Sequence, residues 1–359
     1  MRKRRTTAAS ALLALSLTLG ACASGDGKPM NASADGEASP SASSDYTKPI
    51  VLTGASPDGT APLFQALNDG FASYWKEKTG QAVTVNQSAA SSDKQEAAVN
   101  DGRLKADLVT LGIGTDIDAI QAKGLIEEGW QQRYDYNSSP FFTAVAFAVR
   151  SGNPKGIKTW DDVAKPGVKV VAANPKTYGD ARWFYAGAWA YALDKAGDEN
   201  AAKTFVSAVY KNVAQLEADE AAAQARFVDQ ADGDVWITTE AEALALANGA
   251  AKGKIDIVVP PATLTVEPIV SVVDKNADAN GTREAANGYA DYLFTEQAQT
   301  IAAQHYFRPR FASVAEQYAT QFPETKLLTV DDNLDGWEDL NAKQFADGGM
   351  FDQLVGAGR

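Results

Sequence analysis

Short apolar runs alternate with amphipathic segments through most of the chain. The runs at 49–53, 83–87, 108–111, 142–149, 168–172 and 234–238 have strand composition. Apolar residues recur at helical spacing in 63–79, from 94 onward, and in 181–196, 201–210, 220–228 and 283–304. This alternation predicts an α/β fold. The chain shows no internal repeat of fixed period.

The chain beyond residue 47 has the length of two domains with separate cores. The apolar runs at 142–150 and 268–274 lie far apart in sequence and would suit two strands that cross between lobes. We therefore expect residues 48–141 and 268–359 to form lobe I, and residues 142–267 to form lobe II.

The N-terminus has the layout of a secretory signal. Arg2, Lys3, Arg4 and Arg5 precede an apolar run at 8–20 that is too short to span a bilayer. The run ends in Leu-Gly-Ala-Cys at 19–22, which resembles a bacterial lipoprotein processing box. We expect residues 1–21 to be a lipoprotein signal peptide and Cys22 to carry the lipid; the alternative is an ordinary signal peptide with a chance cysteine.

Residues 22–47 are rich in Ser, Ala, Gly and Asp, which predicts a flexible, lipid-anchored linker. The expected location is therefore the extracytoplasmic face of the cell membrane, periplasmic or at the cell surface. Removing the signal takes away four basic residues and no acidic ones, so 29 basic residues face 46 acidic residues. This balance argues against nucleic acid as a partner.

The residues needed for common catalytic sites are scarce. His305 is the only histidine and Cys22 the only cysteine. Zinc sites and Cys–His pairs are therefore disfavoured, and the sequence has no Gly-x-Ser-x-Gly elbow, Walker loop or dinucleotide fingerprint. His305, near the end of a helical segment, suggests a structural or solvated role. We expect no enzyme, no metal site, no tightly bound cofactor and a monomer; a surface enzyme using two carboxylates is the weaker alternative.

Several segments carry a family resemblance. They include KADLVTL at 105–111, VRSGNPK at 149–155, NPK at 174–176, YKNV at 210–213 and YFRPR at 306–310. In this order they resemble the sulfate- and thiosulfate-binding proteins of bacterial ABC importers. The resemblance implies a two-lobed fold of the type II periplasmic-binding-protein class, with a hinge and an interlobe ligand cleft. It also implies delivery of a small solute to ABC permease subunits.

The loops that should hold an anion depart from the family pattern. The resemblance aligns the family's ligand loops with 88–93, 178–180 and 219–222, and its tryptophan donor with Thr239. Serine is retained at 91, and Asp58 matches an aspartate near the family's cleft. The resulting candidate ligand residues are Asp58, Ser91, Ser92, Tyr178, Gly179, Asp180, Arg182, Glu220 and Thr239.

The acidic substitutions leave several ligands open. Sulfate or thiosulfate is the default because the rest of the chain resembles the family, and a protonated oxyanion such as phosphate is a second option. A zwitterionic or cationic solute would make use of Asp180, Glu220 and Glu240. Asp180 would alternatively cap the helix that follows it, and Asp93, Asp219 and Thr238 or Thr239 have similar capping roles. Arg182 would offset one of the carboxylates.

Overall fold

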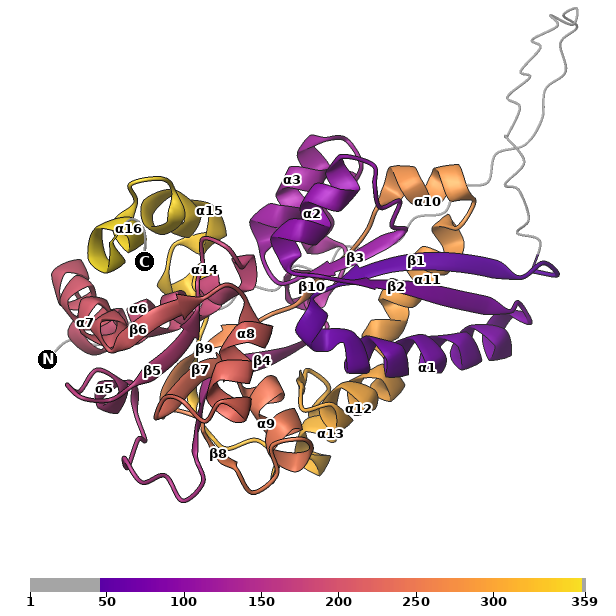
Figure 1. Ribbon diagram of the computed structural model, residues 1–359. Helices are drawn as coiled ribbons and strands as arrows, with labels where there is room; N and C mark the ends of the chain where they lie inside the picture. The colour runs from indigo at the N-terminus through magenta and orange to yellow at the C-terminus, as the bar shows by residue number, and fades with distance from the viewer. Residues whose placement is uncertain (1–45, 357–359) are drawn as a thin grey trace, which may run out of the picture. The chain divides into compact units, whose positions relative to one another are not determined.

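The computed structural model describes residues 46–356, which fold around two β-sheets (Figure 1). The expected signal peptide, lipidated Cys22 and most of the expected linker lie outside these residues. The smaller sheet has the order β10-β3-β1-β2, in which β1 is parallel to β2 and β3 while β10 is antiparallel to β3. Its strands are β1 (Ile50–Ser56), β2 (Val83–Ala89), β3 (Leu108–Leu111) and β10 (Ile269–Val272).

Helices cover this smaller sheet, and together they form what we call the small-sheet lobe. Helix α1 buries Leu63, Leu67 and Phe71 against it and ends at Gly80, whose φ of 79° suits glycine. The helices and short turns of this lobe are η1 (Asp58–Thr60), α1 (Ala61–Thr79), α2 (Ser92–Asn100), α3 (Gly114–Ala122), η2 (Trp130–Gln132), α4 (Asp135–Ser138), α10 (Asp274–Asn280), α11 (Arg283–Leu293), α12 (Glu296–Gln304) and α13 (Ala312–Gln317).

The larger sheet has the order β12-β9-β4-β7-β5-β6, and β4 also pairs with β8 and β11. Its central strand β4 is almost wholly buried, which explains its continuous apolar sequence. The strands are β4 (Phe141–Arg150), β5 (Val170–Ala173), β6 (Val213–Glu217), β7 (Val235–Thr239), β8 (Ile255–Val258), β9 (Ala262–Val266), β11 (Arg308–Pro309) and β12 (Lys326–Leu328).

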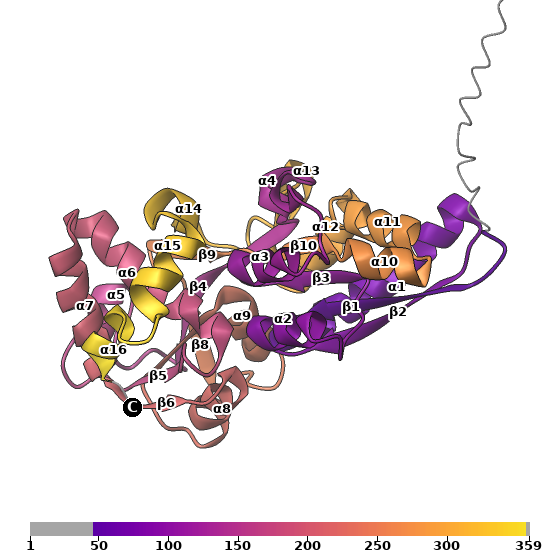
Figure 2. The ribbon, with the colours of Figure 1, turned by 90° about the horizontal axis from the view of Figure 1, so that it is seen from above.

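The larger sheet and its helices form what we call the large-sheet lobe. Helix α6 is apolar on most sides because it lies between the sheet and the C-terminal helices (Figures 1 and 2). The helices and short turns are α5 (Trp160–Val163), η3 (Gly179–Ala181), α6 (Arg182–Ala196), α7 (Glu199–Lys211), α8 (Glu220–Gln224), η4 (Ala225–Asp229), α9 (Glu240–Asn248), α14 (Val330–Asn333), α15 (Gly336–Leu340), η5 (Asn341–Phe345) and α16 (Met350–Val355).

The C-terminal segment packs differently from the expected division of the chain. That division placed residues 268–359 in lobe I. In the structure β12 pairs with β9, and Val330, Trp337 and Phe351 join the hydrophobic core of the large-sheet lobe. Residues 326–355 therefore pack with the middle of the chain, because their apolar side chains cover α6 and α7.

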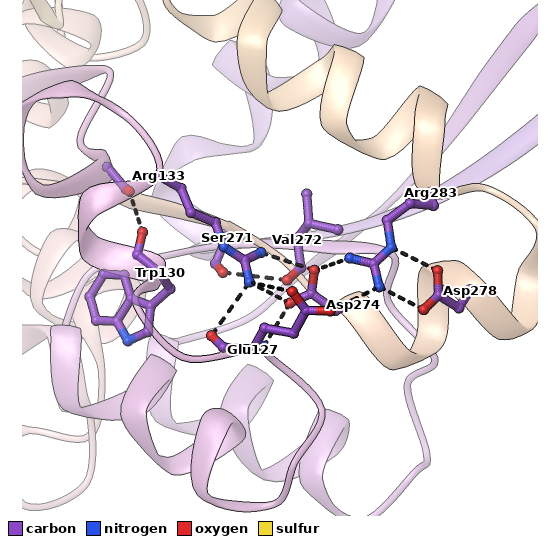
Figure 3. Close-up of polar contacts among 9 residues, drawn as sticks. Glu127, Trp130, Arg133, Ser271, Val272, Asp274, Asp278 and Arg283 are labelled. Atoms are coloured by element: carbon purple, nitrogen blue, oxygen red, sulfur yellow. Dashed lines mark hydrogen bonds and ion pairs between the residues drawn. The ribbon is translucent and has the colours of Figure 1, made fainter. Parts of the chain in front are cut away.

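The strands β9 and β10 are joined by Glu267 and Pro268, so the chain passes from one sheet to the other within two residues. The end of β10 and the start of α10 are fixed by an ion-pair network (Figure 3). The nearly buried Asp274 accepts two hydrogen bonds of 2.9 Å from Arg133 and one of 2.7 Å from the Glu127 backbone N–H. Arg283 also pairs with Asp274 and with the exposed Asp278.

Within residues 46–356, no helix is both long and apolar enough to cross a membrane.

Candidate functional site

A cavity of about 150 Å³ lies between the two lobes. This volume is about ten times the roughly 10–15 Å³ that a single buried water molecule needs, so the cavity can enclose a small solute. From the small-sheet lobe it is lined by Pro57, Gly59, Thr60, Pro62, Leu63, Gly112, His305, Tyr306 and Phe307. From the large-sheet lobe and the connection between β9 and β10, the cavity is lined by Thr143, Tyr178, Asp180, Trp183, Phe184, Glu220, Thr238, Thr239, Ala241, Glu242, Ala245, Val266 and Pro268.

Three carboxyl groups line this cavity: those of Asp180, Glu220 and Glu242. Both carboxyl oxygens of Glu220 and the Oδ1 atom of Asp180 are buried without a hydrogen-bond partner. Burial raises the pKa of Asp180 to about 8, against the opposing hydrogen bond from Ser92. Burial also raises the pKa of Glu242 to about 7 and that of Glu220 well above its usual range. These carboxyl groups therefore retain protons near neutral pH.

The remaining wall of the cavity is largely aromatic and aliphatic. Phe184 and Phe307 are nearly buried, as is Tyr178, which is 5% exposed. Burial and the nearby carboxylates raise the pKa of the Tyr178 hydroxyl, so this group stays protonated. It donates a hydrogen bond of 2.9 Å to Asp58 of the small-sheet lobe. Asp58 therefore lies at the rim of the site, joined to its wall.

Two carboxyl–amide contacts cross between the lobes beside the cavity. The Asp180 Oδ2 atom accepts the backbone N–H of Ser92 at 3.2 Å. In the opposite direction, the Asp93 Oδ1 atom accepts the backbone N–H of Gly179 at 3.3 Å. The indole N–H of Trp183, in α6, also donates across the gap to the backbone oxygen of Gly112 at 3.0 Å. The structure thus shows the two lobes in direct contact.

The structure places the sequence-predicted residues in three groups. Tyr178, Asp180, Glu220 and Thr239 line the cavity, and Asp58 is at its rim. A second group does not line the cavity. Ser91 and Ser92 lie at the start of α2, and Gly179 lies in η3, on the opposite lobe.

Arg182 was expected to offset one of the carboxylates; it does not line the cavity, but its charge partly offsets the rise that burial causes in the pKa of Asp116. Its guanidinium donates to Asn341 at 3.2 Å and lies over the ring of Phe345, at 5.5 Å from the ring centroid. These partners are more than 150 residues further along the chain, so the loop alone could not indicate them. The C-terminal segment, rather than the ligand site, therefore determines where the guanidinium points.

The expected capping roles have mixed outcomes. Asp219 caps α8 by accepting the Ala222 N–H at 2.9 Å, and Thr239 caps α9 by accepting the Glu242 N–H at 3.1 Å, as predicted. Asp180 does not cap the helix that follows it: α6 begins after Ala181 without a side-chain cap. Its carboxyl group instead meets the first turn of α2 in the other lobe.

Glu240 was expected to serve a cationic ligand, and this interpretation is wrong. Its side chain is fully buried and forms two hydrogen bonds, of 2.6 and 2.9 Å, with the guanidinium of Arg308. The cavity is lined instead by Glu242, two residues further on in α9. In a helix the side chains of residues i and i+2 point in different directions, so one of the two could face the cavity while the other faces Arg308.

Sequence reasoning also missed His305, which lines the cavity at the end of α12. Burial lowers the pKa of its imidazole, which favours the neutral form. Asp116, in the first turn of α3, was not predicted either, although it does not line the cavity. Its Oδ2 atom is buried without a partner, and burial raises its pKa to about 6. No local pattern marked either residue, because their positions depend on how the lobes meet.

The carboxyl groups do not form a metal site. Among residues 46–356, no three or more His, Cys, Asp or Glu side chains are grouped so that they could hold a metal ion. The arrangement instead offers several hydrogen-bond acceptors, one neutral imidazole and aromatic walls to a small molecule enclosed between two lobes.

Comparisons with known proteins agree with this geometry. The family described as bacterial extracellular solute-binding protein matches residues 52–308. The sulfate-binding protein of Escherichia coli (strain K12) is 43% identical over 314 residues, which cover 87% of this chain and 95% of the relative. The thiosulfate-binding protein of Pseudomonas aeruginosa is 40% identical over 304 residues, covering 84% and 91% of the two chains.

Among solved structures, the sulfate-binding protein SubI from Mycobacterium tuberculosis H37Rv superposes with a TM-score of 0.74. It is 30% identical and covers 82% of this chain and 99% of its own. The Trichodesmium protein IdiA (FutA), at 18% identity and a TM-score of 0.59, shares the fold alone. These matches confirm the expected fold class, and the relatives are solute-binding proteins rather than enzymes. The chain belongs to the family of bacterial extracellular solute-binding proteins, alongside its sulfate- and thiosulfate-binding members.

Proposed function

We propose that this protein is a lipid-anchored receptor that captures a small organic cation or zwitterion and delivers it to an ABC importer. The receptor role follows from the family, whereas the ligand class and the anchor are proposals. The carboxyl groups of the interlobe cavity carry the proposal for the ligand. Sulfate, the default from resemblance, fits this cavity less well.

The observation that carries the proposed ligand class is the state of Glu220. Both of its carboxyl oxygens are buried without a hydrogen-bond partner, as is the Oδ1 atom of Asp180, which lines the same cavity. Unpaired polar atoms of this kind are costly unless a ligand satisfies them. A ligand with N–H donors and positive charge would pair with both groups, and would favour their ionised forms.

A fully ionised oxyanion meets the opposite situation. Two unit charges of the same sign 4 Å apart repel by about 4 kcal/mol at an effective dielectric constant near 20. Micromolar affinity corresponds to only about 8 kcal/mol of binding free energy. Because burial keeps Asp180 and Glu220 protonated near neutral pH, this repulsion opposes sulfate only where one of them ionises, and there it would remove much of that free energy.

The aromatic wall supports the same ligand class. Tyr178, Trp183 and Tyr306 line the cavity together with two phenylalanines. Aromatic faces attract alkylammonium groups, and aliphatic walls accommodate their methyl or methylene groups. A dianion gains little from such walls because they offer it few donors.

A thermal-shift panel tests the proposal. The mature chain beginning at residue 22, with Cys22→Ser to remove the anchor, is heated with glycine, glycine betaine, choline, putrescine, sulfate, thiosulfate and phosphate. A solute that binds the folded state raises Tm by mass action. We expect a shift with at least one ammonium compound and none with sulfate or thiosulfate. A shift with the anions alone would contradict the proposed ligand class.

Sulfate or thiosulfate is the second candidate. It is favoured by the names of relatives that are about 40% identical over most of the chain. Phosphate tests a third possibility, since a carboxylate can accept the proton of a protonated oxyanion. The same panel separates all three ligand classes.

The anchor has its own test. We expect the wild-type chain, labelled in cells with an alkyne fatty acid, to carry the label and to sediment with membranes. Cys22→Ala should abolish labelling. Whether this variant stays with the membrane or is released should then depend only on whether its signal peptide is cleaved. A labelled Cys22→Ala chain, or an unlabelled wild-type chain, would contradict lipidation at this residue.

A further inference from the structure

The contacts between residues 92–93 and 179–180 are reciprocal. Ser92 and Asp93 lie in the first turn of α2 in the small-sheet lobe, and Gly179 and Asp180 lie in η3 of the large-sheet lobe. Each pair provides one backbone N–H donor and one carboxyl acceptor. We call these four residues the interlobe latch.

Each carboxyl group of the latch also lies against a glycine of the other lobe. A Cβ atom placed on Gly112 would come within 2.6 Å of the Asp180 Oδ1 atom, and one placed on Gly179 would come within 2.9 Å of the Asp93 Oδ1 atom. Such distances are shorter than real Cβ contacts. The absence of side chains at Gly112 and Gly179 is therefore what lets the two carboxyl groups reach the opposite lobe.

The Ser92 N–H is the kind of donor that binds anions. The first N–H groups of a helix have no partner within the helix, and the helix dipole favours negative charge there. A second feature marks the same place as a polar site: the hydroxyl of Ser91, at the N-cap position of α2, is buried and has no hydrogen-bond partner. Asp180 meets this turn from across the gap between the lobes.

We propose that the Asp180 carboxyl group occupies the donor that an anionic ligand would need: its Oδ2 atom accepts the Ser92 N–H, it holds the lobes together with Asp93, and it thereby excludes oxyanions from the cleft. Asp180 is thus a specificity-determining residue, and the lobes close without an anion between them. The inference rests on the proposed function in one respect only, namely that the cleft is the ligand site. It does not depend on which cation binds.

Removing the carboxyl group should release the donors of α2 to an external anion. Sulfate is titrated calorimetrically into the wild-type mature chain, Asp180→Gly, the milder Asp180→Ser, and the control Asp198→Gly. Asp198 caps α7 on the exposed surface, so this control removes a helix-capping aspartate away from the cleft. We expect sulfate affinity to rise roughly 10- to 100-fold in the two Asp180 variants, the range that a hydrogen bond to a charged group supplies. It should not change in Asp198→Gly.

A folded Asp180→Gly or Asp180→Ser chain without a gain in sulfate affinity would overturn the proposal. Equal gains in the Asp198 control would do the same. This result can be distinguished from a failure of the ligand class proposed above. If no ammonium compound binds the wild-type chain but Asp180→Gly gains sulfate binding, the latch is supported and the proposed ligand class is wrong.

A second experiment measures whether the lobes are closed and does not require the Asp180→Gly chain to fold. Spin labels are attached at Lys94→Cys on α2 and Ala221→Cys on α8, both exposed positions, in a chain with Cys22→Ser. We expect one narrow interlabel distance without ligand, retained in Asp180→Asn, which keeps an acceptor oxygen. The distance should lengthen in the Asp93→Ala, Asp180→Ala double variant. A broad or long distance in the ligand-free parent chain would overturn closure by the latch.

Discussion

The carboxyl group of Asp180 caps a helix of the opposite lobe, with its Oδ2 atom 3.2 Å from the Ser92 nitrogen. It leaves the helix that directly follows it, α6, without a side-chain cap. A residue type that usually stabilises its own helix therefore contributes here to contact between lobes. The stability of the closed protein and the chemistry of the cleft consequently depend on the same side chain.

The buried carboxyl groups of the cleft should make the stability of the protein depend on pH. Burial raises the pKa of Asp180 to about 8 and that of Glu242 to about 7, and Asp116, Asp58 and Asp93 surround Asp180 with further acidic groups. Between about pH 4 and pH 8 the folded chain holds protons that the unfolded chain has lost. Its free energy of unfolding should therefore fall as pH rises, by up to about 1.4 kcal/mol per pH unit for each such group.

Urea unfolding of the ligand-free mature chain from pH 4.5 to 8.5 measures this slope. Asp180→Asn removes one titrating group while keeping the side-chain shape, so it should flatten the dependence. The exposed control Asp198→Asn should leave the slope unchanged. A wild-type chain whose stability rises through this window would contradict the protonation of these carboxyl groups in the folded protein.

Glu220→Gln tests the ligand class at a second position. The change keeps the side-chain volume and removes the charge that a cation would induce. Binding of the ammonium compound identified in the thermal-shift panel should weaken roughly 10- to 100-fold, because a hydrogen bond to a charged group contributes about 1.5–3 kcal/mol. Glu199→Gln, at an exposed position in the first turn of α7, is the matched control. Equal affinity in Glu220→Gln and the wild type would show that Glu220 does not contact the ligand.

Gly112→Ala tests the close approach of the latch. The new Cβ atom would lie 2.6 Å from the Asp180 Oδ1 atom, so the carboxyl group must move away from the small-sheet lobe. We expect a longer interlabel distance in the spin-label experiment and a lower Tm. At Gly114, the nearest atom to a new Cβ is at an ordinary 3.7 Å, so Gly114→Ala should leave the distance unchanged. Identical behaviour of the two variants would argue against the packing described for Asp180.

The network around Asp274 predicts unequal costs for two neighbouring aspartates. Asp274→Ala leaves Arg133 and Arg283 without their shared, nearly buried partner, and should lower the free energy of unfolding by about 3 kcal/mol (Figure 3). Asp278 is largely exposed, so Asp278→Ala should cost less than about 1 kcal/mol. Urea denaturation compares them, and similar costs would contradict a structural role for the buried carboxylate.

The features predicted best were strands and helix caps, which depend on residues close together in the sequence. Strand β3 has the predicted bounds, and the cap of α8 by Asp219 and that of α9 by Thr239 were correct. The single helix expected at 283–304 is in fact two, α11 and α12. Thr295 begins the second by accepting the Ala298 N–H, a local signal that the apolar spacing concealed.

The site was predicted in part, and the misses have a common cause. Tyr178, Asp180 and Glu220 come from loops that family resemblance could align, and all three line the cavity. Arg182 and Glu240 were misplaced because their partners, Asn341 and Arg308, are distant in sequence. Side-chain direction there is decided by tertiary contacts, which neither periodicity nor local composition encodes.

On our proposal, the carboxyl groups of the cleft make it a site for cations rather than for oxyanions. Calorimetric titration of the wild-type mature chain, with sulfate and the ammonium compounds compared in one buffer at two salt concentrations, tests it most directly. We predict binding of an ammonium compound, weakened by salt, and no heat from millimolar sulfate. Micromolar sulfate binding to the wild-type chain would contradict the account.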